Sequence, residues 1–600
     1  MSRAQLQHKS EQLSQLLLDE LNPEGFWSGE LSSSALAVAV AVAALHFHDA
    51  DRHAPQIQLG LEWLQQQVNA DGSFGDTVDS PGNVSTSLLV YAALNLYPAN
   101  RAVCALQSKT EKWLLIQGID VRSEEIIQVI LTHYKNDYTF SVPILTLCGL
   151  CGVPGPKAFQ FIPQLPYELA LLPRKFYRFL KLSVVSYAIP ALVAVGIVVY
   201  KKKRTNWFWR AIRHFSIQPA LKRLERMMPA SGGFLEAIPL TAFVSLSLIN
   251  AGFRDHPVVT KGISFLKNTQ RSDGGWAIDV DLSTWVTTLS VKALRQQADG
   301  VLSAPQKRML VQHLLDCQTR AVHPFNGSQP GGWGWTSFPG SVPDGDDTPG
   351  AMLALMQLDH RVESLSAVVV ACRWLKDLQN SDGGFPTFSR GWGKLPFDQS
   401  CCDLTGHCVL ALAMALNRCQ SRLTASERAG IQTMLNRAIN YLEHRQQADG
   451  SWLPLWFGNQ RQANHANPVY GTARVACYLS DALCQNELNG ALKDKLAVMI
   501  SKARSYLVVV QNADGSWGGD GGIPGSIEET ALAVSALAGK KTYRQACTKA
   551  MAWLHDYEQA FGLTAAPIGL YFASLWYHEK LYPVTCYLEA VNRLLLDEPG

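Results

Sequence analysis

The stretch that decides the fold is Trp374-Leu-Lys-Asp-Leu-Gln379-Asn-Ser-Asp382-Gly-Gly-Phe385, because it is one copy of a phrase that recurs along the chain. Each copy has an aromatic-Leu pair, an Asp-Gly dipeptide seven residues after the Leu, and an aromatic residue just beyond it. The last four copies also have a Gln four residues after the Leu, where the first copy has Val68. A phrase that repeats in this way predicts a helical-repeat architecture. The copies span residues 63–74, 265–276, 374–385, 441–452 and 506–517, with degenerate copies at 25–27, 232–234 and 331–333.

Each copy separates two helices of different character. The residues before Asp-Gly have the spacing of an amphipathic helix, and a more apolar helix follows the aromatic residue, as in 405–416, TGHCVLALAMAL. Asp-Gly ends the first helix because Gly tolerates positive φ. We expect the apolar helices inside a double ring, with the Gln bonded to backbone groups at the end of a neighbouring helix. The sequence therefore predicts an all-α fold of α/α toroid (barrel) domains built from helix-pair repeats, which by itself also suits a binding scaffold.

The bulk composition narrows the class of protein. With 600 residues the chain is too long for one ordinary core, so two domains are expected. Hydrophobic residues make up 47%, charged residues 17%, and the formal net charge is +3. No dense Lys/Arg block is interleaved with aromatic residues, so nucleic acid is not an expected partner. The first residues have no apolar signal-peptide core, and with 13 cysteines this predicts a reducing cytosol and free thiols.

One acidic motif, Pro343-Asp344-Gly-Asp346-Asp347-Thr348, carries the candidate chemistry. Three carboxyls this close cannot all ionise cheaply, so repulsion keeps a proton on at least one of them. Pro349 suits a first helical position, which would place the carboxylates near a helix N-terminus. The alternative is a solvated acidic loop or a calcium loop, but the ordered ligands of an EF-hand are missing.

These motifs resemble those of the squalene-hopene cyclase family over nearly the whole chain. Residues 343–348 resemble the family's DxDDT acid motif, and 330–335 the stretch that leads to it. Asp403-Leu-Thr-Gly-His407 is similar to the segment that carries the acid's histidine partner. The resemblance implies two α-helical barrel domains, one inserted into the other. Residues 20–245 would form the inserted domain, and residues 1–19 and 246–600 the domain with the acid motif.

The resemblance also implies roles for single residues. Asp346 would protonate an alkene, and a cationic His407 would stabilise the carboxylate that remains. Asp344, Asp347 and Asp403 would surround this pair. Aromatic faces stabilise a migrating cation without attacking it, each by about 0.5–2 kcal/mol. The candidate lining residues are Trp285, Trp335, Phe388, Trp456, Phe234, Tyr571 and Phe572.

The resemblance predicts a class II terpene cyclase that protonates squalene and closes it to a hopene-like triterpene. The alternatives are another prenyl substrate, such as a C20 diphosphate or a C35 polyprene, a non-catalytic toroid, and a prenyltransferase β-like zinc toroid. Asp403, His407 and Cys408 raise the zinc alternative, although we predict neither a metal nor a cofactor. Residues 457–470 are longer than the family's usual link, and Glu236 is an unexpected charge near a lining position.

Residues 184–200, VVSYAIPALVAVGIVVY, precede four basic residues at 201–204 and Trp207-Phe-Trp209. Seventeen residues interrupted by Pro190 are at the lower limit for a membrane span. Basic and Trp residues beside an apolar stretch suit a membrane interface, although a buried barrel helix has the same pattern. With the resemblance, this predicts a peripheral (monotopic) protein on the cytoplasmic side of the membrane, and leaves open whether it is a monomer or a homodimer.

Overall fold

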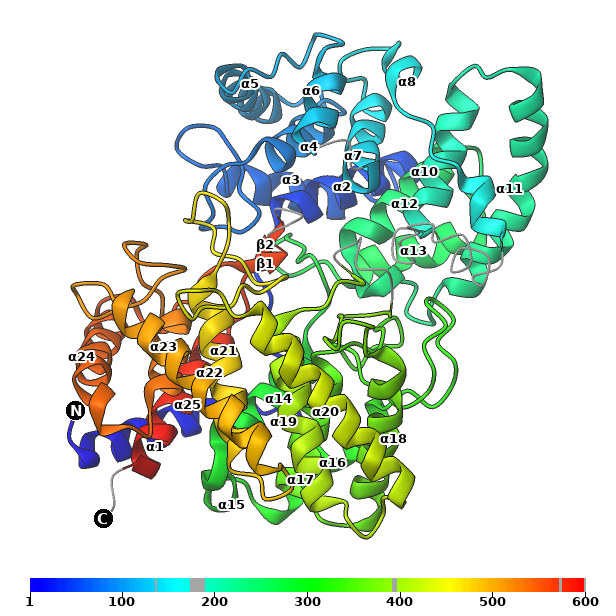
Figure 1. Ribbon diagram of the computed structural model, residues 1–600. Helices are drawn as coiled ribbons and strands as arrows, with labels where there is room; N and C mark the ends of the chain where they lie inside the picture. Colours follow the sequence, from blue (N-terminus) through cyan, green and yellow to red (C-terminus); the bar gives the residue numbers. More distant parts are fainter. Residues whose placement is uncertain (135–137, 173–188, 391–396, 571–574, 598–600) are drawn as a thin grey trace.

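The structure is a computed structural model that describes residues 1–134, 138–172, 189–390, 397–570 and 575–597. Its helices form two groups, each around its own hydrophobic core (Figure 1). The group drawn in blue to green contains α2 (Ala35–Asp49), α3 (Ala54–Gln66), α4 (Val84–Leu94), α5 (Arg101–Ile116), α6 (Ile126–His133), α7 (Tyr138–Leu150), α8 (Ala158–Phe161), η1 (Tyr167–Leu171), α10 (Ile189–Lys202), α11 (Trp207–Met227), η3 (Phe234–Glu236), α12 (Ile238–Asn250) and α13 (Pro257–Asn268).

The second group combines the first helix with the remainder of the chain. Ser10 on α1 donates to Asn592 on α25 at 2.6 Å, which joins the two ends of the described chain. The group contains α1 (Arg3–Asp19), α14 (Ser283–Leu294), η4 (Arg295–Gln297), α15 (Ala298–Val301), α16 (Ala304–Cys317), α17 (Asp347–Leu358), α18 (Val362–Leu378), α19 (Cys402–Arg418), α20 (Ala425–Arg445), α21 (Pro468–Leu483), α22 (Gly490–Val509), α23 (Ile527–Leu537), η5 (Lys541–Tyr543), α24 (Arg544–Phe561) and α25 (Tyr582–Asp597).

Each group closes into a ring of helices. In the first, the contacts run from α2 to α4, α7, α10 and α12 and return to α2. In the second, they run through α14, α17, α19, α21, α23 and α25 and return to α14. These inner helices are the apolar ones, and amphipathic helices such as α20 and α22 lie outside them. The predicted all-α toroid fold is confirmed, whereas the domain bounds 20 and 245 stay a prediction.

The repeated residues join neighbouring helix pairs. The side-chain amide of Gln379 donates to the carbonyl of Gly383 at 2.8 Å and to that of Met434 on α20 at 3.0 Å. Gln446 makes the equivalent bonds to Gly450 and to Met499 on α22, each at 2.9 Å. Gly383 has φ 95°, and a Cβ there would lie 2.4 Å from the carbonyl oxygen of Arg437, so only glycine fits. The predicted Gln bond is thus present, although its acceptors on α20 and α22 lie within those helices and not at their ends.

A small sheet lies where the two rings meet (Figure 1). Strands β1 (Ile568–Leu570) and β2 (Leu575–Tyr577) are antiparallel, with Gly569 opposite Trp576. The backbone N–H of Trp576 donates to Asp76 at 3.1 Å, and Leu31 forms a bridge with Glu579. The segment after α24 therefore ties the second ring to the first.

The apolar stretch before the basic residues is part of a core. Residues 189–199 of α10 are almost all buried, and residues 184–188 lie outside the described residues. The described part of this stretch is therefore a buried barrel helix, which was the alternative to a segment at a membrane interface. Within the described ranges, no helix is both long and apolar enough to cross a membrane.

Candidate active site

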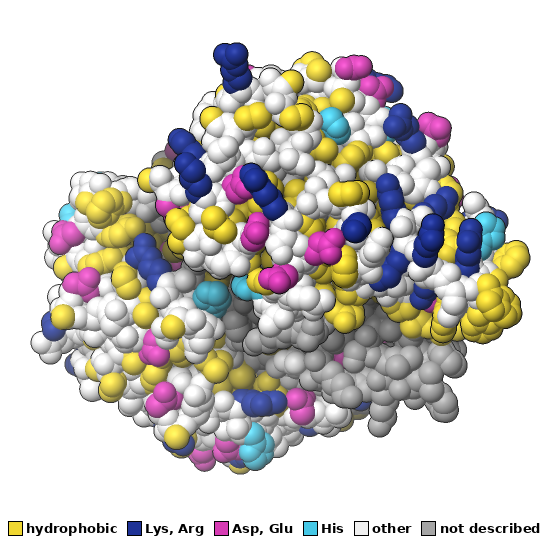
Figure 2. All heavy atoms as spheres, turned by 90° about the horizontal axis from the view of Figure 1, so that it is seen from above, with side chains coloured by type: hydrophobic (Ala, Val, Ile, Leu, Met, Phe, Trp, Pro, Cys, Tyr) yellow, Lys and Arg dark blue, Asp and Glu magenta, His cyan; other side chains and the backbone are white. Residues whose placement is uncertain are grey.

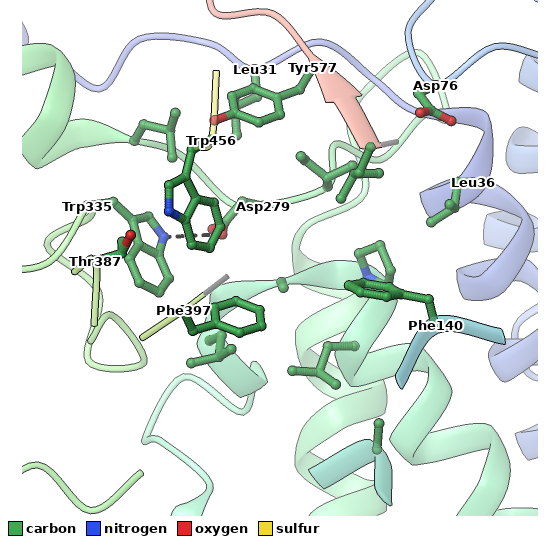
Figure 3. Close-up of a pocket in the computed structure, with 18 of the residues that line it drawn as sticks. Leu31, Leu36, Asp76, Phe140, Asp279, Trp335, Thr387, Phe397, Trp456 and Tyr577 are labelled. Carbon is green, nitrogen blue, oxygen red and sulfur yellow. Dashed lines mark hydrogen bonds between the residues drawn. The ribbon is translucent and has the colours of Figure 1, made fainter. Parts of the chain in front are cut away.

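A cavity of about 440 Å³ is lined by residues of both rings (Figure 3). This volume is typical of small-molecule sites, which measure about 300–1,000 Å³. Leu36, Phe140 and Leu240 come from the first ring, and Trp285 and Leu404 from the second. Among the described lining residues the ionisable side chains are five carboxyls and two tyrosines, and no Lys, Arg or His contributes. The carboxyls belong to Asp76, Asp279, Asp344, Asp346 and Asp347.

The acid motif forms the start of α17. One carboxylate oxygen of Asp344 accepts the backbone N–H of Asp346 at 2.8 Å and that of Asp347 at 2.7 Å. A Cβ on Gly345 would lie 2.4 Å from the carbonyl oxygen of Pro386, which explains the glycine inside the motif. The helix begins at Asp347, so Pro349 is its third residue and not its first as predicted. The carboxylates still lie at the helix N-terminus, where negative charge is favoured.

Asp346 accepts hydrogen bonds from two side chains. Its Oδ1 lies 2.8 Å from Nδ1 of His407, and its Oδ2 accepts the indole N–H of Trp285 at 3.2 Å. Burial raises the pKa of Asp346, but the hydrogen bond and charge of His407, together with the charge of Arg474, outweigh burial and hold the pKa below its ordinary value. Burial lowers the pKa of His407, and the Asp346 carboxylate offsets this only in part. Both partners favour the Asp346 carboxylate, which makes protonated Asp346 a strong acid.

The two flanking carboxyls behave in the opposite way. Burial raises the pKa of Asp344 to about 7 and raises that of Asp347 well above its ordinary value. Repulsion from Asp346 adds to both shifts, and repulsion from Asp344 adds to that of Asp347. Asp403 lies apart from this pair and accepts the thiol of Cys401 at 2.6 Å. Burial also raises the pKa of Asp403, to about 6. The motif therefore holds one carboxyl that favours ionisation beside two that favour protonation.

An aromatic side chain stacks on one face of the His407 imidazole. The ring of Tyr478 on α21 lies parallel to the imidazole, with centroids 4.4 Å apart and planes 9° apart. Lys292 places its ammonium 4.6 Å from the centroid of Tyr478 and 3.1 Å from Glu589. Tyr478 and Lys292 belong to no recognisable motif, so neither could be predicted from the sequence.

Arg474, also on α21, places a positive charge near Asp346. It is buried, and its guanidinium donates to the hydroxyl of Tyr582 at 3.1 Å. The ring of Tyr582 lies 4.8 Å from that of Trp285, which donates to Asp346. No carboxylate lies within ion-pair distance of Arg474 among the described residues. The sequence feature that marks Arg474 is its position on an apolar helix just after Tyr470-Gly-Thr, because an Arg is rarely buried.

The predicted aromatic residues form a cluster in the cavity wall. Phe388 lies 6.0 Å from Trp335 and 5.7 Å from Trp456, in both cases edge to face. Trp285 also lines the cavity. Phe234 lies fully buried in the first core as the aromatic residue of a degenerate repeat, and Tyr571 and Phe572 lie outside the described residues.

Many lining residues were not predicted from the sequence, and four of them stand beside the predicted ones or add a charge to the wall. Phe397 lies 5.4 Å from Trp456, and Phe457 stacks on Trp285 at 6.2 Å. Phe457 opens the long link 457–470, which is anchored by bonds from Asn459 and Asn467 to Glu529. Tyr577 on β2 and Asp279 before α14 complete the wall (Figure 3). Only the unusual length of the link marked this region in the sequence.

The side chains that raised the zinc alternative do not converge. His407 contacts Asp346, Asp403 contacts Cys401, and the thiol of Cys408 points to the carbonyl of Gly345 at 3.7 Å. In the part of the chain that the structure describes, no three metal-ligating side chains gather. The zinc alternative therefore has no geometric support there.

The chain is similar to known proteins in sequence and in fold. The model of the squalene-hopene cyclase C-terminal domain matches residues 282–562, and that of the N-terminal domain matches residues 11–118. Enfumafungin synthase of Hormonema carpetanum is 24% identical over 90% of this chain, which spans 44% of that protein's length. Squalene hopane cyclase of Aspergillus fumigatus is 23% identical over 82% of this chain and 75% of its own. The structure of ent-copalyl diphosphate synthase from Streptomyces platensis, 16% identical, superposes over 98% of this chain and 99% of its own with a TM-score of 0.55, which shows a shared fold.

An all-α double toroid with three clustered aspartates on an apolar cavity defines a class II terpene cyclase. Two family models together match more than half of the residues. The chain belongs to the squalene-hopene cyclase family.

Proposed function

We propose that this protein protonates squalene and closes it to a hopene-like triterpene. The observation that carries the proposal is the charge of the cavity wall. Its described residues include five carboxyls and neither Lys nor Arg, while most of the others are apolar or aromatic. An uncharged polyprene fits such a wall. A diphosphate would bring negative charge beside carboxylates with no cation to bind it.

The first chemical step belongs to Asp346. Its proton passes to a terminal alkene carbon, and the N–H groups of His407 and Trp285 stabilise the carboxylate that is left. Asp347 favours its protonated form, and Asp344, with a pKa of about 7, is protonated below that pH, so in the acid range the two add little negative charge beside Asp346. The largely apolar wall that both rings contribute disfavours the water that would quench a cation early.

The cation then moves along aromatic faces. The ring of Phe388 lies nearly at right angles to the rings of Trp335 and Trp456, so faces and edges alternate along the wall. Each face stabilises a cation by about 0.5–2 kcal/mol without forming a bond. A hydrocarbon chain folded against this wall is held by burial alone, which suits a substrate without a head group.

The test is to incubate the purified protein with squalene, with a C35 polyprene and with geranylgeranyl diphosphate, and to analyse the extracts by mass spectrometry. A cyclic C30 product from squalene is expected. Cyclisation of the diphosphate alone would show that the charge argument is wrong.

We infer further that the protein meets its water-insoluble substrate at a lipid surface, through α11. Trp207 is 81% exposed and Phe215 78% exposed, and Phe208 and Trp209 are exposed beside them. Figure 2 shows hydrophobic side chains gathered at the edge of the molecule, next to Lys and Arg. Lys201, Lys202 and Arg204 are also exposed, and basic residues favour the anionic cytoplasmic leaflet. Flotation with vesicles of mixed neutral and anionic lipids tests this, and recovery entirely below the vesicle layer would contradict it.

A further inference from the structure

Two carboxyls line the cavity outside the acid motif, and they differ in how they are bonded (Figure 3). Asp76 accepts Thr86 and Asn83 on one oxygen, the latter at 2.8 Å, and the N–H of Trp576 on the other at 3.1 Å. These donors come from the start of α4 and from β2, so Asp76 joins the first ring to the segment after α24. No further partner is needed to explain it.

Asp279 has fewer partners. Its Oδ1 accepts the N–H of Val280, its own neighbour, at 2.8 Å, and its Oδ2 accepts the indole N–H of Trp335 at 3.2 Å. The carboxyl points at Trp335, near Trp456 and Tyr577 (Figure 3). A carboxyl group has about four lone-pair sites, or one O–H and the remaining acceptors when protonated. Part of its bonding capacity therefore faces the cavity.

The backbone holds Asp279 in this position. Ala237 forms a bridge with Asp279, and the N–H of Val280 donates to the carbonyl of Glu236 at 3.2 Å. The charged neighbours are Asp281 and Glu236, both acidic. Burial, with repulsion from these two, raises the pKa of Asp279 well above its ordinary value. The side chain is thus a fixed carboxyl in the cavity wall that favours its protonated form, and its hydrogen-bond partners among the described residues are both N–H donors.

A buried polar hydrogen without an acceptor is costly, and native proteins rarely leave one. A pure hydrocarbon offers no acceptor, and the rest of this wall is largely apolar. We propose that Asp279 forms an oxygen-binding subsite in the cyclisation cavity. This rests on the proposed function, because it takes the cavity as the place of the polyprene.

The oxygen has two sources with the same chemistry. It is either a hydroxyl or epoxide oxygen on the polyprene, or a water molecule that captures the last cation. In the water case, the water oxygen forms the new C–O bond, one of its O–H bonds breaks, and the proton returns through solvent to the Asp346 carboxylate. The balance is then one polyprene plus one water giving one cyclic alcohol.

Binding is measured first with ligands that cannot react. Quenching of tryptophan fluorescence reports the affinity of squalane and of a saturated C30 alcohol with the same skeleton, because Trp335 and Trp456 line the cavity. We expect the native protein to bind the alcohol at least about tenfold more tightly, the discrimination that one buried hydrogen bond gives. Asp279→Asn keeps a donor and retains part of this preference, whereas Asp279→Leu binds both ligands equally. Leu36→Ala, a cavity residue away from Asp279, should weaken both ligands and leave the preference intact.

Equal binding of the two ligands by the native protein, or an unchanged preference in Asp279→Leu, overturns the subsite while the proposed function stands. Failure of squalane to bind at all overturns both. The source of the oxygen is then read from turnover of squalene in ¹⁸O-labelled water. A labelled cyclic alcohol that Asp279→Leu replaces by a hydrocarbon identifies water. Hydrocarbon products from both proteins, with an oxygenated polyprene converted faster only by the native protein, identify an oxygen on the substrate.

Discussion

The ring of Tyr478 lies parallel to the imidazole of His407, with centroids 4.4 Å apart, while Nδ1 at the edge of the same imidazole bonds Asp346. His407 is therefore held between a hydrogen bond at its Nδ1 and a stacked ring on its face. Stacking of this kind fixes the plane of the imidazole, and with it the direction of the bond to Asp346.

Tyr478→Leu should lower kcat for squalene by about 10- to 100-fold, because a small misplacement of a catalytic group has effects of that size. Tyr478→Phe keeps the ring and should stay within about threefold of the native rate. Steady-state turnover and thermal melts of both variants check this. Equal activity in the Leu and Phe variants would mean that the stack plays no part in positioning His407.

Asp346→Asn should reduce turnover by more than the 10²–10⁴-fold that loss of a positioned acid ordinarily costs, because no water can replace it without quenching the cation. His407→Phe should reduce turnover less, since the proton on Asp346 remains. Asp344→Asn and Asp347→Asn should fall between the native protein and Asp346→Asn. Thermal melts should change little, because Asn at position 344 retains the oxygen that accepts the two backbone N–H groups. A fully active Asp346→Asn protein would refute the assignment of the acid.

Turnover should increase as the pH falls through the acid range. The active form carries a proton on Asp346, whose pKa lies below its ordinary value, so this form is scarce at neutral pH and grows as the solution becomes more acidic. Above a pH of about 7 Asp344 ionises as well, and its charge beside Asp346 makes proton release harder. The pH dependence of kcat for squalene checks this. A rate that increases with pH would show that the carboxylate and not the acid is the active form.

Arg474→Gln should shift that pH profile to higher pH and lower its maximum by about three- to tenfold. The guanidinium is one of the charges that lower the pKa of Asp346, so its loss leaves a weaker acid that is protonated more easily. The titratable and charged groups that interact with Asp346 are Asp344, Asp347, Asp403, His407, Arg474, Cys408, Tyr470, Tyr478 and Tyr577, and Lys292 acts on His407.

Arg474→Lys keeps the charge and serves as the control, with a profile close to that of the native protein. If Arg474 serves only packing, the Gln and Lys variants will lose activity equally at every pH.

Replacing Trp207, Phe208 and Phe215 by Ser should reduce co-flotation with vesicles at least tenfold, since these exposed rings provide the apolar contact with lipid. The melting temperature should not change, because the three side chains contact mostly solvent. Leu115→Ser with Ile116→Ser is the matched control, as these residues are 61% and 79% exposed at the end of α5. Equal loss of flotation in both sets would mean that lipid binding is not localised on α11.

The repeat in the sequence predicted the fold well because its parts act locally. The period of the apolar residues defines each helix, and the Gln reaches only as far as the next outer helix, as Gln379 and Gln446 show. The helices end earlier than expected, since α18 and α20 stop directly before Gln379 and Gln446 and not at the Asp-Gly turn. The motif positions Asp344, Asp346, Asp347 and His407 meet as expected, although their catalytic roles stay predictions. Local patterns thus identified what lies within a repeat or a motif.

The remainder of the site depends on how distant helices face each other. Arg474 and Tyr478 lie one turn apart on α21, and only the packing of α21 against α19 turns Tyr478 toward His407. Asp279, before α14, and Tyr577, on β2, enter the same wall from segments almost 300 residues apart in the chain. The exposed rings of α11 were predicted, but the apolar stretch before them is a core helix, which periodicity alone does not distinguish from an interfacial one.

The bond between Asp76 and Trp576 also bears on the order in which the protein is made. The ribosome releases the first ring, including Asp76, long before residues 576–579 emerge. Until then a nascent chain has a ring of helices whose inner wall lacks Tyr577 and is open to water or to a chaperone. Because contacts of such long range form slowly, closing of the cavity is a late event in the synthesis of the enzyme, and the apolar wall is the part that most needs protection before it.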